Sequence, residues 1–413
     1  MTQIQQIGIV LGLDYEVGRA VLRGVISYAR PGKPWVFRFL QESPRLVSSP
    51  ESRQIDGFIG SLAQSGITEA FLGLGKPGVN VSNHRDCVPM PTVVTDDVTV
   101  GRLAARHFLD RGYRRFAFFG QWETHYRKER EQGFTAELAA ASPDGPPEFS
   151  SYLSWCAQQG KTNPGSMTHV QEWVKTLPRS TAVLAVNDRA GWVLSEICRQ
   201  NDVSVPEAIA ILSVDNDMPI CMAAYPQLSS IATSGERIGY EAARKLDQLL
   251  QGAASTSERL LVPPKAVITR RSTNTLAIED PELARAVNFI RDSAARSIDV
   301  EEVVAAVGIA RRSLERKFRM GLGRTPLEEI RRAHLDRAQE LLMSTDLPMP
   351  AIAAQSGFES AVRLTTVFRE MTGTTPTSFR RQYRLHDGEE GDVGEMGEAE
   401  AVEVTPSADS AAV

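Results

Sequence analysis

Three clusters of polar side chains each follow a short apolar run in the first two thirds of the chain. Carboxylates and amides supply paired hydrogen-bond acceptors and donors, which suit a ligand with neighbouring hydroxyl groups. If the apolar runs are parallel strands, their carboxyl ends meet at one edge of a sheet, where such folds bind small molecules. The clusters are Asp14-Tyr15 after residues 7–13, Asn187-Asp188 after residues 181–186, and Asp215-Asn216-Asp217 after residues 209–214.

A second candidate for chemistry is an arginine-containing sequence that occurs twice near the end of the chain. Residues 318–326 read FRMGLGRTP and residues 368–376 read FREMTGTTP, and Leu314 and Leu364 fall on the same spacing. A repeat of this kind indicates one supersecondary unit used twice. Arginines on the outer face of a helix can bind DNA phosphates and the edges of guanine bases.

The residues around each repeat predict two helices joined by a tight turn. In the first unit, Asp299 and Glu302 are expected to form a capping box at the start of a helix over residues 300–306. Gly308 then allows the turn of a helix-turn-helix, and a second helix is expected over residues 311–320. Gly357 takes the same place in the second unit.

A long helix is predicted between the two units. Thr325, Pro326 and Glu328 form a strong helix start, and apolar residues continue at helical spacing to Leu342. A rigid helix here would hold two recognition helices at a fixed separation, so that each can enter a major groove about one turn apart.

An ordinary helical bundle with a solvated, arginine-rich face is the alternative interpretation. Arginine-rich helix faces by themselves favour that alternative. The duplicated glycine turn together with the shared FRxxxGxTP pattern reverses the balance. We therefore expect a double helix-turn-helix domain that binds DNA.

The first 270 residues alternate short apolar runs with helical patterns. This alternation predicts an α/β fold whose parallel sheets are covered by helices on both faces. The expected strands are residues 7–13, 57–62, 78–82, 92–95, 115–119, 181–186 and 209–214, and the expected helices are residues 18–30, 98–111, 128–141, a helix from 189, and 236–251.

Composition and charge divide the chain into four parts. Residues 280–386 hold 17 basic against 14 acidic side chains, whereas residues 387–413 hold nine acidic side chains and no basic one. The net charge of −5 therefore conceals a basic segment. The acidic end has too little apolar surface to fold, and a partner-binding role for it stays open. The expected parts are a sensor domain (1–272), a polar linker (273–281), a DNA-binding domain (282–385) and a disordered acidic tail (386–413).

The sequence lacks the patterns typical of enzymes, metal sites and membrane proteins. It has no phosphate-binding loop, nucleophile elbow or dinucleotide fingerprint, and its histidines have no metal-ligand spacing. The N-terminal apolar run is too short for a signal peptide or a membrane span. Four widely spaced cysteines indicate reduced, buried thiols in a cytoplasmic protein rather than a disulfide framework or a zinc site; they are Cys87, Cys156, Cys198 and Cys221. We expect no catalytic residue, cofactor or metal.

The DNA-binding region resembles the AraC-type transcription regulators over about 100 residues. The family signature stands here as Gly357, Phe358, Phe368, Arg369, Gly373, Pro376, Phe379 and Arg380. The resemblance implies that the first recognition helix reads DNA through Arg311, Arg312, Glu315 and Arg316, and the second through Ser360, Ala361, Val362, Arg363 and Thr365. Many members carry arginine where this chain has Thr366, so the second helix is expected to read bases more weakly.

The first domain resembles the two-lobed sugar sensor of the LacI-type repressors, which is similar to the periplasmic sugar-binding proteins. The resemblance implies that Arg130, in the motif RxxGF, clamps sugar hydroxyls and that Asp215 binds a hydroxyl at a strand end. It also implies that Asp188, with Asn187 beside it, lines the site.

Three further residues are candidates for the sugar site. Tyr15 and Trp122 are expected to offer an aromatic face, and Arg19 a polar contact. The alternatives are a core position for Trp122, and a solvated loop and helix face for Tyr15 and Arg19.

This domain order resembles AraC-type activators that respond to xylose. It implies an activator that binds a double-stranded DNA operator as a homodimer, with RNA polymerase as a partner. The expected effector is D-xylose or another pentose bound between the lobes; Asn187 and residues 13–18 differ from the xylose pattern, which leaves the sugar open. The alternative is a constitutive DNA-binding regulator with a degenerate or non-sugar sensor.

Overall fold

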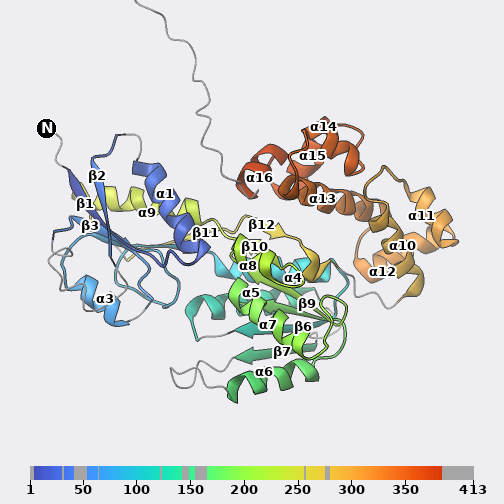
Figure 1. Ribbon diagram of the computed structural model, residues 1–413, viewed down its shortest axis with the longest axis horizontal. Helices are drawn as coiled ribbons and strands as arrows, with labels where there is room; N and C mark the ends of the chain where they lie inside the picture. Colours follow the sequence, from blue (N-terminus) through green and yellow to red (C-terminus); the bar gives the residue numbers. More distant parts are fainter. Residues whose placement is uncertain are drawn as a thin grey trace, which may run out of the picture.

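The chain folds into two α/β lobes followed by an all-helical region, as Figure 1 shows. The computed structural model describes residues 4–29, 32–40, 54–63, 65–120, 123–141, 148–153, 165–254, 257–274 and 280–383. Trp122, Cys156, the acidic tail and residues 275–279 of the expected linker lie outside the described residues. Within the described ranges, none of the helices has the length and apolar character needed to span a bilayer.

The N-lobe is built on a six-stranded parallel sheet with the order β11-β5-β4-β3-β1-β2. Helices α1 and α9 pack against one face through Val21, Val25, Ile238 and Ala242, and α3 packs beside Phe58 through Ile67 and Phe71. The strands are β1 (Gln5–Val10), β2 (Trp35–Phe39), β3 (Gly57–Gly60), β4 (Gly78–Asn80), β5 (Thr92–Thr95) and β11 (Arg259–Val262), and the helices are α1 (Glu16–Ala29), α3 (Ser65–Leu72) and α9 (Gly235–Leu250).

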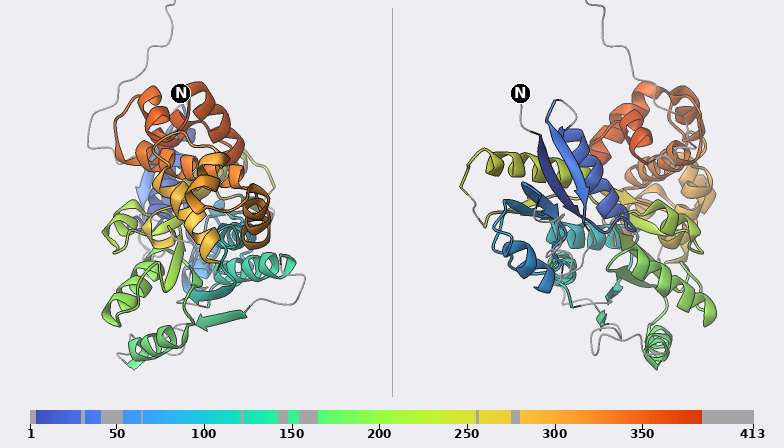
Figure 2. Two further views of the ribbon diagram at one scale, coloured as in Figure 1. Left: turned by 90° about the vertical axis from the view of Figure 1, so that its right-hand side faces the viewer. Right: turned by 60° about the vertical axis from the view of Figure 1, so that its left-hand side comes forward.

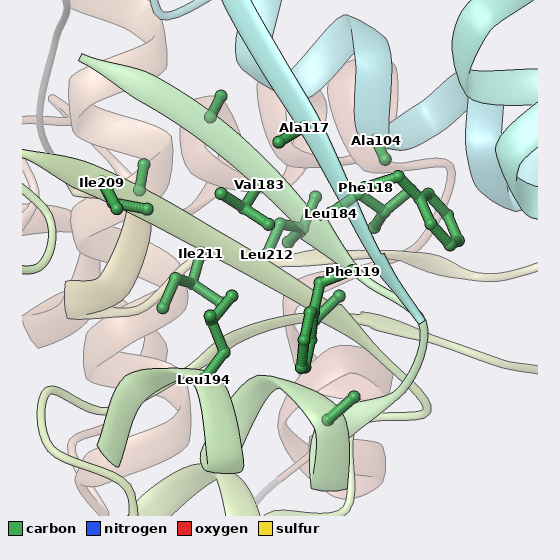
Figure 3. Close-up of a cluster of buried hydrophobic side chains, with 14 of the residues drawn as sticks. Ala104, Ala117, Phe118, Phe119, Val183, Leu184, Leu194, Ile209, Ile211 and Leu212 are labelled. Atoms are coloured by element: carbon green, nitrogen blue, oxygen red, sulfur yellow. The ribbon is translucent and has the colours of Figure 1, made fainter. Parts of the chain in front are cut away.

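The C-lobe repeats this plan with the order β12-β10-β9-β8-β6-β7, and only the pair β10–β12 is antiparallel. Its strands carry side chains to helices on both faces: Figure 3 shows Phe119 and Ile211 pointing toward Leu194, while Phe118 lies near Ala104. The elements are α4 (Asp97–Leu109), β6 (Arg115–Gly120), α5 (His125–Ala140), β7 (Glu148–Leu153), α6 (Gly165–Thr176), β8 (Thr181–Ala185), α7 (Asp188–Gln200), β9 (Ile209–Val214), α8 (Met218–Ala223), β10 (Ser229–Ala232), β12 (Ala266–Ile268) and the 3₁₀ turn η1 (Arg271–Thr273).

The chain passes between the lobes three times, from β5 into α4, from β10 into α9, and from β11 to β12. These crossings form the hinge between the lobes. The sequence did not predict β2, β7, β10, β11 or β12. Four of these five strands lie at sheet edges, and β10 lies next to one; the half-exposed positions of β2 and β11 give no continuous apolar run.

The helical region holds two similar units joined by one long helix. The first unit has a core around Leu314 and Phe318, the second has a core around Leu364 and Phe368, and α13 contributes to both. In Figures 1 and 2 these helices lie at the opposite end of the C-lobe from α6 and β7. The helices are α10 (Pro281–Asp292), α11 (Val300–Val307), α12 (Arg311–Leu322), α13 (Pro326–Ser344), α14 (Met349–Gln355), α15 (Ala361–Thr372) and α16 (Pro376–Tyr383).

The predicted turns and helix starts are mostly present. Gly308 and Gly357 adopt left-handed φ values of 76° and 74°, which glycine accepts without strain. Thr325 and Glu328 form the full capping box at the start of α13. At α11 only half of the predicted box forms: Asp299 accepts from the backbone N–H of residue 302, but the Glu302 carboxylate pairs with Arg296 instead.

One expectation about the cysteines is wrong. Cys198 and Cys221 are free and buried, as expected, but Cys87 is exposed. It lies in the irregular segment between β4 and β5, where no apolar pattern in the sequence marks burial.

Candidate effector and DNA-binding sites

Asp215 follows β9 directly, at the carboxyl end of the C-lobe sheet, in a backbone conformation that is rare for residues other than glycine. Its φ is 107°, and that of Asn216 is 53°. The backbone N–H of Asp215 donates to the Ile231 carbonyl oxygen of β10 at 2.9 Å, which holds the turn in place. Backbone strain that is held in this way concentrates at binding sites. The Asp215 side chain remains 22% exposed.

Arg130 of α5 faces Asp215 and is held by the ends of two other elements. Its Nε donates to Asp97 Oδ1 at 2.7 Å, and its Nη1 donates to the Val186 carbonyl oxygen just after β8. Its Nη2 lies 3.7 Å from Asp215 Oδ1. The Tyr126 ring centroid lies 4.9 Å from the guanidinium carbon. A guanidinium fixed at this point can donate to ligand oxygen atoms without losing further rotamer freedom.

Asp97 belongs to this cluster although the sequence analysis did not single it out. It is the first residue of α4, its side chain is 1% exposed, and its Oδ2 accepts from Asn83 Nδ2 at 2.6 Å. A signal for it was present, because Asp96 and Asp97 follow the strand predicted over residues 92–95 in the same way as the other polar clusters follow theirs.

Two glycines bring Asp97 and Arg130 together. A Cβ on Gly101 of α4 would lie 2.1 Å from the Arg130 carbonyl oxygen, and a Cβ on Gly133 of α5 would lie 2.0 Å from the Val98 carbonyl oxygen. Since real side chains do not approach backbone so closely, only glycine at both positions permits α4 and α5 to touch. The RxxGF motif therefore carries both the arginine and the packing that positions it.

The electrostatics of the cluster are dominated by buried carboxyl groups. Burial raises the pKa of Asp215 to about 8, the Arg130 guanidinium opposes this rise, and Asp188 and Asp97 add to it. Burial also raises the pKa of Asp97, despite the nearby guanidinium. Burial lowers the pKa of Arg130, but the carboxylates of Asp97 and Asp215 outweigh it and keep this pKa above its usual value. The guanidinium therefore stays charged, while Asp215 can exist as a neutral acid that donates a hydrogen bond.

Asp188 lies directly beneath this cluster and its carboxylate is occupied by protein donors. Oδ1 accepts from the hydroxyls of Ser213 at 2.5 Å and Ser230 at 2.6 Å, and Oδ2 accepts from the backbone N–H of Asp217 at 2.6 Å. Burial raises the pKa of Asp188 to about 6, although these donors oppose the rise. In this arrangement Asp188 holds the 215–217 turn, so its expected direct contact with sugar stays a prediction.

The other predicted effector residues lie around the same strand ends. Asn187 caps α7 by accepting from the backbone N–H of Ala190 at 2.9 Å. Tyr15 is 49% exposed and its hydroxyl lies 3.5 Å from Arg189 Nη1. Arg19 of α1 donates across the lobes to Asp217 Oδ2 at 3.2 Å, and it also pairs with Glu16. The structure thus uses Arg19 to link the lobes; contact of any of these residues with a ligand stays a prediction.

The predicted DNA-contacting residues of the first unit lie on the outer face of α12. Arg312 and Arg316 are exposed, and among the described residues neither makes an ion pair. Arg311 instead pairs with Glu315 at 3.1 Å and with Glu301 at 2.5 Å, which leaves it less available to a phosphate. The face is therefore cationic mainly through Arg312, Arg316 and Arg319, which is also exposed.

The second unit presents a chemically different face at the start of α15. Ser360 caps this helix by accepting from the backbone N–H of Arg363 at 3.2 Å, and Arg363 itself is exposed. Val362 is 76% exposed, which is unusual for an apolar side chain but suits contact with a thymine methyl group. Thr365 donates to the Ala361 carbonyl oxygen at 2.8 Å, so its hydroxyl proton is already used.

Within the described parts of the chain, no group of histidine, cysteine and acidic side chains could hold a metal ion. Comparison with protein families matches residues 105–273 to a periplasmic binding protein-like domain and residues 303–382 to a helix-turn-helix domain. The first match covers most of the C-lobe, with Arg130 and Asp215, together with α9 and β11 of the N-lobe, and the second covers the two helical units with Arg312 and Val362.

Relatives of known function match nearly the whole chain. The xylose operon regulatory protein of Escherichia coli strain K12 is 29% identical over 391 residues, which span 92% of this chain and 97% of that protein. The protein of the same name from Haemophilus influenzae is 26% identical and spans 92% of this chain and 98% of its own length.

Solved structures agree with this match. A structure described as a xylose-binding transcription activator superimposes with a TM-score of 0.60 at 27% identity, and the match covers 93% of this chain and 100% of that one. A LacI family transcriptional regulator from Enterococcus faecium shares the fold of the first two thirds, with a TM-score of 0.53 at 21% identity over 66% of this chain and 100% of that one.

Proposed function

We propose that this chain responds to D-xylose or another pentose and activates transcription. It is an AraC-type DNA-binding transcription regulator with a periplasmic-binding-protein-like sugar sensor, and it is not an enzyme. The pair formed by Arg130 and the partly exposed Asp215 carries the proposal. A charged donor and a carboxyl group that can accept or donate, set side by side at strand ends, match neighbouring hydroxyl groups of a sugar.

The sugar would lie between the lobes. Asp215 and Arg130 belong to the C-lobe, Tyr15 and Arg19 follow β1 of the N-lobe, and the link from Arg19 to Asp217 already spans the gap. A ligand that contacts both lobes binds the closed arrangement more tightly than the open one and therefore favours closure. We assign Asp188 the task of positioning the 215–217 turn, and Asn187 that of a further polar contact. Trp122 stays a candidate for the aromatic face.

The DNA operator would be read mainly by α12. Arg312 and Arg316 are exposed cations of this helix without an ion pair among the described residues, and an arginine that contacts guanine gives about 1–3 kcal/mol of discrimination. The face formed by Ser360, Val362 and Arg363 on the second unit would add apolar and phosphate contacts. We propose that the protein acts in the cytoplasm as a homodimer and that RNA polymerase is its partner at the promoter.

A thermal-shift measurement on the full-length protein tests the sensor. The panel contains D-xylose, D-ribose, L-arabinose, D-glucose and D-galactose. A stabilising pentose is expected, because a ligand that binds only the folded state raises the melting temperature. The shift should disappear in Asp215→Asn and persist in the matched control Asp202→Asn, which alters an aspartate in the turn after α7, outside the site.

Absence of a shift with every sugar would instead support a constitutive regulator with a degenerate or non-sugar sensor. The proposal that the protein recognises a DNA operator is independent of that result. Selection from a library of random duplexes with the wild-type protein should yield a defined sequence, and recovery of no enriched sequence would contradict operator recognition.

A further inference from the structure

The sensor touches the DNA-binding region through a polar joint at the carboxyl end of α4. Asp110, the C-cap residue of α4, pairs with Arg332 of α13. The next residue, Arg111, has Nη2 3.6 Å from Asp336 Oδ2, one turn further along α13. Arg114 donates to the carbonyl oxygen of Gly321 near the end of α12 at 3.4 Å. The joint therefore contacts both the long connecting helix, α13, and the first recognition helix, α12.

The opposite end of α4 lies in the effector site. Its first residue is Asp97, which binds Arg130, and its last residues adjoin the joint. Thirteen residues of α-helix span about 20 Å at roughly 1.5 Å per residue. The close approach of Gly101 and Gly133 locks α4 to α5, so this helix moves as part of one rigid pair.

A second set of contacts places the joint beside the hinge between the lobes. One buried cluster contains Leu335 of α13 together with Ala232 and Ile268. Ala232 ends β10, which leads into one crossing, and Ile268 lies in β12, just after another. A change in the crossing segments on lobe closure would therefore reach α13 through this cluster. Leu335 lies between Arg332 and Asp336 in the sequence, so the apolar and polar contacts share one turn of that helix.

Buried hydrogen bonds also join the 215–217 turn to α4. Asn216 Oδ1 accepts from Arg270 Nη2 at 2.8 Å, and the backbone of Arg270 bonds with the Ser229 hydroxyl. That hydroxyl accepts from Thr273 Oγ1 at 2.7 Å, which lies 2.9 Å from His107 Nε2. Arg111 Nε then donates to the Thr273 carbonyl oxygen at 3.2 Å.

We propose that α4 transmits the state of the effector site to the DNA-binding region, and that Asp336 and Arg332 of α13 receive it. This inference rests on the proposed function, since it names the route by which a sugar would alter DNA binding. A joint made of ion pairs suits this task, because its partners keep favourable contacts with water when they separate, whereas an apolar joint of the same size would resist opening.

The charges around the joint are nearly balanced and come from both regions. Arg111 and Asp110 belong to the sensor, while Arg332 and Asp336 belong to α13. Arg291 of α10 and the Glu329 carboxylate, which pairs with Arg324, lie close enough to complete the cluster. Removing the Asp336 charge therefore leaves Arg111 without its only carboxylate partner among the described residues, and should loosen the joint without altering either ligand-binding face.

The test measures thermodynamic coupling in the full-length chain. Fluorescence anisotropy gives the Kd for a duplex selected by the wild-type protein, with and without saturating D-xylose. In the wild type this sugar should change the Kd by about 5- to 150-fold, the usual range of allosteric coupling. In Asp336→Asn the ratio of the two Kd values should fall to within about twofold of unity, while calorimetry finds the D-xylose affinity unchanged.

Glu340→Gln is the matched control, because it neutralises an exposed carboxylate that pairs with Arg337 on the same helix. Asp110→Asn, at the other ion pair of the joint, should lower the ratio as Asp336→Asn does and serves if the latter fails to fold. If Asp336 and Asp110 only stabilised the fold, their substitution would change the melting temperature or the DNA affinity but would leave the ratio of the two Kd values unchanged. A coupling ratio equal to that of the wild type in both joint variants overturns the inference alone. A ratio of one in the wild-type protein overturns the response to D-xylose and, with it, the inference.

Discussion

Replacing Arg130 separates its structural contribution from its proposed contact with the sugar. The Arg130 side chain is 6% exposed and that of its partner Asp97 is 1% exposed. Arg130→Met keeps the length and apolar stem of the side chain but leaves the Asp97 carboxylate buried, with the Asn83 amide as its remaining side-chain donor among the described residues. Removing one partner of a buried ion pair costs about 3–5 kcal/mol, and we expect a loss of this size in the unfolding free energy of the sensor at pH 7.5.

The loss should depend on pH in a defined direction. Without the guanidinium, the pKa of Asp97 rises further above its usual range, because burial is then opposed by less positive charge. A raised pKa means that the folded state holds the proton more tightly, so its contribution to stability is lost as pH rises. The difference between wild type and Arg130→Met should therefore be larger at pH 8 than at pH 5.

Urea unfolding followed by tryptophan fluorescence measures this loss in the sensor alone, since all five tryptophans precede residue 193. Arg106→Met is the matched control. Arg106 pairs with Glu137 across the same two helices but is 63% exposed, and an exposed pair contributes only about 0–1 kcal/mol.

The double variant Arg130→Met with Asp97→Asn distinguishes the two roles. It removes the buried charge together with its partner, so much of the stability should return. Sugar affinity should stay about ten- to a hundredfold below wild type, because a hydrogen bond to a charged donor is worth about 1.5–3 kcal/mol. A loss below about 1 kcal/mol in the single variant would refute the assigned burial cost, and recovered sugar affinity in the double variant would refute the contact.

Three further predictions follow from the same structure. Arg312→Ala and Arg316→Ala should each weaken binding to a selected duplex by about 1–3 kcal/mol in a gel-shift titration while circular dichroism stays unchanged, because both side chains are exposed on α12. Gly357→Ala should lower the melting temperature more than Gly308→Ala: both residues have left-handed φ values, but a Cβ at 357 would lie 2.4 Å from a ring nitrogen of α13, whereas a Cβ at 308 meets nothing within 4 Å. Asp215→Asn should flatten the decline in sensor stability between about pH 4 and about pH 8, measured by thermal unfolding, because burial raises the pKa of Asp215 to about 8 and the folded wild type then keeps a proton that the unfolded chain has already released.

Each of these has an outcome that contradicts its reasoning. Unchanged affinity and sequence preference in both arginine variants would remove α12 from base recognition. Equal effects of the two glycine substitutions would show that the close contact between a Cβ at 357 and the His334 ring of α13 does not lower stability. Parallel pH profiles for wild type and Asp215→Asn would show that Asp215 titrates near its ordinary value.

The amino-acid sequence by itself determined the two classes of domain and the chemistry of their surfaces. Apolar runs alternating with helical patterns predicted an α/β fold with parallel sheets, because buried strands and amphipathic helices have different periods. The glycine turns and the repeated Phe-Arg pattern specified two similar helical units, since Gly308 and Gly357 supply a conformation that other residues avoid. The resemblance in the RxxGF motif singled out Arg130, and the position after a strand singled out Asp215; their contact with a sugar stays a prediction.

Only the tertiary structure decided which partners these residues have. Asp188 and Arg19 were candidates for direct contact with a ligand and Asp97 was not singled out, yet they are paired with two serine hydroxyls, with Asp217 and with Arg130 respectively. The contacts of Asp110 and Arg111 with α13 span more than 220 residues and leave no local pattern. Periodicity reports how each element faces the core, but long-range pairing depends on how elements pack together, and that is set by the whole fold.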